Sequence, residues 1–134
     1  MSDTSRELAG ILLLALVTVE TGGLYLLAIV RGSTSATPFQ LAFARAGHAH
    51  AAVLLVLALV CQLLADAAAL DGGWEWVARS GVAVAAVLMP GGFFLSSLGE
   101  GRERPNGLLA LVFAGAALLA VGLATLGVGL LRAG

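Results

Sequence analysis

Four long runs of apolar residues, separated by short polar segments, dominate the chain. They cover about residues 8–30, 39–65, 80–98 and 108–131, and each is long enough to cross the roughly 30 Å hydrocarbon core of a bilayer as a helix. The intervening segments are rich in turn residues, as in RGSTSATP and GEGRERPNG. This pattern predicts an all-α integral membrane protein, a four-transmembrane-helix bundle forming a single membrane domain over residues 1–134.

Local signals mark the ends of these predicted helices. Pro38 is suited to the first turn of the second helix, and Asn106 can cap the start of the fourth. Trp74 and Trp76 precede the third run, and indoles favour the headgroup level of a bilayer. Pro90 lies near the centre of the third run, where the missing backbone donor predicts a kink or an interruption.

Composition supports the membrane assignment and excludes several classes of function. The chain is 60% hydrophobic and 11% charged, with a mean hydropathy of +1.01. A net charge of −1 with no Lys excludes a nucleic-acid partner, and the lone Cys61 offers no disulfide and is expected to be packing. The first run lacks a prompt cleavage site and is expected to be retained, in a multi-pass protein of the bacterial cytoplasmic membrane. Arginines are balanced across the two sides, so both orientations, and dual topology, stay open.

Small residues predict close helix packing. In the fourth run Ala116, Ala120 and Ala124 recur every four positions and, with the nearby glycines, would let another helix approach, within the chain or in a homo-oligomer. The first and third runs each carry a Gly-Gly step near the midplane, in ETGGLYLL and MPGGFF, which also favours close backbone approach.

Glu20, near the middle of the first run, is the strongest functional candidate. Placing an ionisable group at this depth in a bilayer costs free energy, and such residues usually mark a functional site. Desolvation disfavours the ionised carboxylate, so we expect a neutral acid that can donate a proton. The alternative is a neutral acid that only hydrogen-bonds a neighbouring helix.

His48 and His50 lie in the first half of the second run, in RAGHAHAA. Two positions on a helix differ by about 200° around its axis, so the two imidazoles face different directions. The two histidines of one chain are therefore not expected to bind the same metal ion or haem. No metal or cofactor is expected. We expect His50 to be the partner of Glu20, with His48 as a further catalytic candidate; an ordinary interhelical hydrogen bond is the alternative for each.

Counted along their apolar runs, Glu20, His50 and Pro90 are expected at similar depths in the membrane, on three different helices. We therefore expect them to meet at one cavity that admits a lipophilic small molecule. The residues expected to line its wall with π faces, which can stabilise a cationic species, are Tyr25, Phe93 and Phe94, with Pro90 beside them.

In layout, the chain resembles the small bacterial membrane-bound terpene cyclases of actinobacterial indole- and diketopiperazine-terpenoid pathways. The resemblance covers the whole chain and rests on VETGG, RAGHAHA and MPGGFF. It implies that an acidic residue protonates a terminal alkene or epoxide of an isoprenoid, followed by ring closure and proton loss. Only Glu20 carries over as that acid.

Three other functions stay open. A proton-coupled multidrug transporter also has four short spans with a membrane-embedded Glu in the first, although the histidines have no role in that scheme. A haem or metal protein would use His48 and His50, from two subunits if necessary. A structural or assembly subunit would have no chemistry of its own.

Overall fold

Four helices account for most of the chain in the computed structural model, which describes residues 1–134. They are α1 (Asp3–Val30), α2 (Pro38–Ala65), α3 (Gly72–Ser96) and α4 (Ala110–Arg132), with a short 3₁₀ helix, η1 (Gly107–Leu109), leading into α4. All four are long and apolar enough to cross a membrane. The predicted all-α membrane bundle is confirmed.

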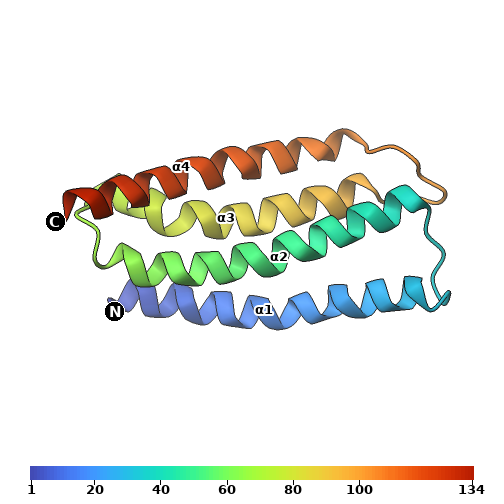
Figure 1. The fold of residues 1–134 in the computed structure, drawn as a ribbon, viewed down its shortest axis with the longest axis horizontal. Coiled ribbons are helices and arrows are strands. Elements are labelled where there is room, and N and C mark those ends of the chain that lie inside the picture. Colours follow the sequence, from blue (N-terminus) through green and yellow to red (C-terminus); the bar gives the residue numbers. More distant parts are fainter.

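The helices lie side by side in the order of the sequence, with neighbours antiparallel (Figure 1). The main packing is α1 on α2, α2 on α3, and α3 on α4. Consequently α1 and α4 form the two edges of the bundle, and much of each helix surface is left uncovered by the rest of the chain.

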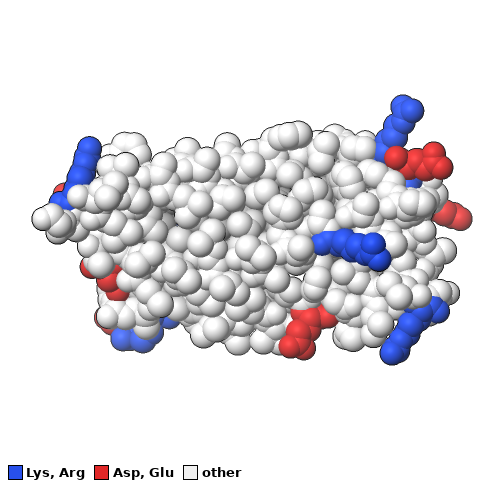
Figure 2. All heavy atoms as spheres, viewed as in Figure 1, with Lys and Arg blue, Asp and Glu red and all other residues white.

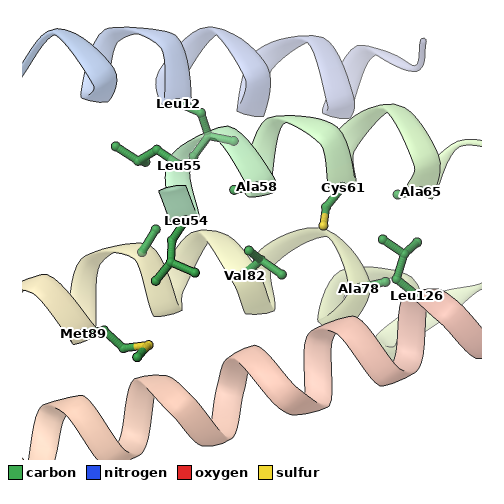
Figure 3. Packing of buried hydrophobic residues seen from close by; sticks show 11 residues of the cluster. Leu12, Leu54, Leu55, Ala58, Cys61, Ala65, Ala78, Val82, Met89 and Leu126 are labelled. Carbon is green, nitrogen blue, oxygen red and sulfur yellow. The ribbon is translucent and has the colours of Figure 1, made fainter. Parts of the chain in front are cut away.

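Small side chains form the core between the helices (Figure 3). Ala58, Ala78 and Val82 are fully buried between α2 and α3, and Cys61 lies among them as a free, packed thiol, as expected. Contact between α3 and α4 is close at Gly81, where an added Cβ would lie 2.9 Å from the Cα of Gly122. Backbone packs directly on backbone there.

The predicted close packing of α4 occurs at its glycines, including the predicted Gly115 and Gly122, and not at its alanine stripe. Gly115, Gly122 and Gly129, spaced seven residues apart, are buried, whereas Ala116, Ala120 and Ala124 are exposed. A heptad repeat keeps residues on one side of a helix, and glycine at each position admits a neighbour: Met89, Gly81 and Leu70 in turn.

The helix ends follow the predicted signals, with corrections in α3. Thr37 and Gln40 form a capping box before α2, with Pro38 in the first turn, and the Asn106 side chain accepts from the backbone N–H of Leu108. However, α3 begins at Gly72, eight residues before the predicted start, and continues through Pro90 without interruption. The amphipathic WEW segment starts the helix instead of preceding it.

Charged side chains gather at the two ends of the molecule, and a mostly uncharged band separates them (Figure 2). The band matches the helices in position, and a helix of 28 residues such as α1 is about 42 Å long. Some charged atoms also lie on the flank (Figure 2), and the helices supply Glu20 and Arg45 well inside their ends. This distribution is that of a multi-pass membrane protein.

Candidate functional site

Glu20 lies in a groove of about 420 Å³ on the side of the bundle, between α1 and α2. The remaining lining is aliphatic apart from His48. Glu20 is exposed and forms no salt bridge or side-chain hydrogen bond, so its carboxyl group is free to meet a molecule in the groove. The residues of this groove, called the lateral groove below, are Leu16, Val19, Glu20, Gly23, Leu24, Leu27 and His48.

His48 reaches the lateral groove because α1 has no side chain at Gly22. A Cβ on Gly22 would lie 3.0 Å from Nδ1 of His48, and one on Gly23 would lie 3.5 Å from its Cε1. The imidazole of α2 therefore packs directly on the Gly-Gly step of α1. The prediction that this step permits a close approach of another helix is confirmed. Nδ1 of His48 is buried and has no hydrogen-bond partner, which is uncommon for a buried polar atom and typical of functional positions.

His50 faces the other way, toward α3. Its Nδ1 lies 2.7 Å from the carbonyl oxygen of Ala46 in the preceding turn, and its ring centroid lies 5.0 Å from that of Phe93. The prediction that the two histidines diverge is confirmed, whereas the pairing of His50 with Glu20 is wrong. Helical spacing fixes the angle between the two residues but not which of them faces α1.

The predicted single cavity is divided among three places. Tyr25 and Phe94 line a separate pocket of about 200 Å³. Phe93 packs on His50 and Phe43, and Pro90 is buried within α3. No space remains beside Gly47 in α2, because a Cβ there would meet the Phe94 ring at 2.8 Å.

A buried polar network joins α1, α2 and α3 at the end of the bundle that holds both termini. The side chain of Arg79, only 5% exposed, pairs with Asp66 at 2.9 Å and with Glu75 at 2.7 Å, and also donates to Oγ of Ser5. Ser5 in turn donates to Asp66 at 2.8 Å, and Nε2 of Gln62 donates to the Arg79 carbonyl at 2.7 Å. The contacts of Arg79 with Ser5 and Asp66 link α3 to the other two helices, whereas its pair with Glu75 lies within α3.

Sequence reasoning missed this network. The carboxylate of Asp66 accepts hydrogen bonds from Ser2 and Ser5 and lies beside the Arg79 guanidinium. These contacts hold the pKa of Asp66 well below its usual range, so the carboxylate stays ionised. The available signal was an arginine three residues after Trp76, at the predicted third span's edge. With a predicted start at residue 80, Arg79 lay just outside the third span, whereas the helix begins about two turns earlier, at Gly72.

A metal site within one chain has no support in the arrangement of ligands. His48 lies against α1 and His50 against α3, and nowhere do three His, Cys, Asp or Glu side chains come close enough together to hold one ion. A haem held between two chains stays an untested alternative.

Comparison with family models, with curated proteins and with solved structures finds no match for this chain. The geometry of the lateral groove is therefore the main indication of function.

Proposed function

We propose that this protein is an integral-membrane enzyme, in the bacterial cytoplasmic membrane, that cyclises a lipophilic isoprenoid by proton transfer from Glu20. The observation that carries the proposal is the lateral groove, where a free carboxyl group and an imidazole with an unpaired nitrogen share one aliphatic lining. The groove lies on the side of a helix bundle, so a substrate dissolved in the bilayer reaches it without passing through water.

The groove suits acid-base chemistry on an apolar molecule. Leucine and valine side chains can bind a hydrocarbon chain by burying its apolar surface. Glu20 is the acidic group of the groove. The protonated form of Glu20 is the one that can transfer a proton to an alkene. Tyr25 and Phe94 line a separate pocket and Phe93 packs on His50. The substrate's own double bonds, not an aromatic wall, therefore stabilise the charge in this groove.

The proposed reaction balances without a cofactor. Glu20 gives its proton to the terminal carbon of an alkene and becomes a carboxylate, and the resulting cation is attacked by the π electrons of a second double bond, which closes the ring. The imidazole of His48, which lines the same groove, takes the proton lost in the last step and returns it to Glu20. The product is an isomer of the substrate.

The proposed proton transfer can be tested by incubating membranes that contain the protein, in D₂O, with a prenylated substrate that has a terminal alkene. We expect a cyclised isomer that carries one deuterium, detected by mass spectrometry. Glu20→Gln should lower turnover by about 10²- to 10⁴-fold, the usual contribution of a general acid. The matched control is Glu103→Gln, an exposed acid in the loop before α4, which should leave turnover unchanged. Full activity of Glu20→Gln would refute the proposal.

The two histidines provide a second test, because they differ in direction but not in chemistry. His48→Gln should reduce turnover by at least about tenfold, whereas His50→Gln should reduce it much less. An equal loss in both variants, or a larger loss in His50→Gln, would contradict the role of the lateral groove.

Proton-coupled transport is the second candidate, favoured by the open position of Glu20 on an edge helix. A transporter returns its substrate unchanged. Liposomes that contain the protein, with a lipophilic cation added outside, therefore distinguish transport from cyclisation. Uptake that depends on a pH gradient and disappears in Glu20→Gln, with no new product, would replace the enzyme proposal with this one.

A further inference from the structure

A second groove, of about 380 Å³, lies at the end of the bundle that holds both termini, between the α2–α3 connection and α4. Figure 1 shows this connection beside the C-terminal end of α4. The residues of this groove, called the terminal groove below, are Ala69, Leu70, Asp71, Trp74, Ala124, Thr125, Val128 and Arg132. It shares no residue with the lateral groove.

The floor of the terminal groove is fixed by the fold. The backbone N–H of Ala69 donates to the carbonyl oxygen of Gly129 at 3.2 Å. The side chain of Leu70 fills the space left by that glycine, where a Cβ would lie only 2.6 Å from the Leu70 Cγ. The connection is therefore held against α4, and the groove does not depend on a flexible loop.

Two opposite charges border this groove without pairing with any other residue. Asp71 makes no side-chain hydrogen bond to the start of α3, and neither it nor Arg132 forms a salt bridge. The Trp74 side chain, in the same groove, is largely exposed at 64%. A cation can meet the carboxylate and the indole face, and an anion the guanidinium.

The apolar part of the groove continues from these charges toward the middle of α4. Arg132, Val128 and Ala124 follow one another at four-residue intervals, so the lining extends about 12 Å along the helix. Polar groups lie at the membrane surface and apolar groups lie deeper, as in a phospholipid with its headgroup and the start of its acyl chain.

We propose that the terminal groove binds a phospholipid with a zwitterionic ethanolamine headgroup. Arg132 contacts the phosphate, Asp71 accepts hydrogen bonds from the primary ammonium, and Trp74 covers that ammonium with its ring. A choline headgroup has no N–H to donate to Asp71, and a glycerol headgroup has no cation for Asp71 and Trp74. The carboxylate is therefore the residue that selects ethanolamine.

Native mass spectrometry of the full chain in detergent tests the selection. The protein is incubated with equal amounts of phosphatidylethanolamine, phosphatidylcholine and phosphatidylglycerol that share the same acyl chains. We expect about three- to fivefold more retained phosphatidylethanolamine than either competitor, the ratio that one net hydrogen bond supplies. Asp71→Asn should remove this preference over phosphatidylcholine, and Arg132→Gln should lower retention of all three lipids.

Matched variants separate lipid binding from folding. Trp74→Leu should lower retention of phosphatidylethanolamine, whereas Trp76→Leu, an equally interfacial tryptophan outside the groove, should not. Equal retention of the three lipids by the unchanged protein, or a preference that survives Asp71→Asn, would overturn the proposal. Selection of phosphatidylglycerol would also overturn it, because it would mean that Arg132 alone binds an anionic headgroup.

Discussion

Gly91 and Gly92 are adjacent in α3 but have opposite surroundings, which makes them a sharp test of how α3 and α4 pack. A Cβ on Gly92 would lie 2.6 Å from Cγ2 of Val112 and 2.7 Å from its backbone nitrogen, whereas a Cβ on Gly91 would have nothing within 4 Å. We predict that Gly92→Ala destabilises the bundle and that Gly91→Ala does not.

The magnitude follows from the backbone contact. The distance of 2.7 Å falls about 0.7 Å short of the 3.4 Å at which ordinary contacts begin, and a backbone atom cannot rotate away as a side chain can. Overpacking of this kind costs about 1–3 kcal/mol. Both variants share the gain of about 1 kcal/mol from replacing glycine in a helix. The difference in the free energy of unfolding between the two variants should therefore be about 1–3 kcal/mol.

Equilibrium unfolding in mixed detergent micelles, followed by tryptophan fluorescence, measures this difference. Val112→Ala added to Gly92→Ala should restore only part of the loss, because the contact with the backbone nitrogen persists. Equal stability of the two alanine variants, within about 0.5 kcal/mol, would show that α3 and α4 do not pack closely at this step.

The polar network and the helix caps give further predictions. Arg79→Leu leaves Asp66 and Glu75 without their ion pairs and should lower the free energy of unfolding by about 2–3 kcal/mol, whereas Arg104→Leu, in an exposed loop, should change it little. The lowered pKa of Asp66 means that its contribution is complete above the ordinary value of about 3.9 and is lost as the pH falls below it. The unfolding midpoint should therefore fall in acid, and less steeply in Asp66→Asn. Thr37→Ala removes the cap of α2 and a hydrogen bond to the loop before α4 and should cost about 1 kcal/mol in unfolding experiments, most of which Thr37→Ser should recover.

The sequence alone determined the four membrane helices, the cap at Asn106 and the opposite directions of His48 and His50. These features follow from local quantities: the length of an apolar run, the hydrogen bonds of a helix end, and 100° of rotation per residue. None of them depends on which helix lies next to which. The Gly-Gly step at Gly22 was likewise visible as a place of close approach.

Only the tertiary structure decided what fills each of these places. His48 shares the lateral groove with Glu20 because the α1 glycines face α2 at that level, and His50 packs on Phe93 because α3 lies on the other side of α2. Arg79 is buried because α3 begins earlier than its apolar run and so carries the guanidinium between α1 and α2. Helical periodicity fixes angles within one helix, but the rotation and register of neighbouring helices depend on packing among residues far apart in the chain.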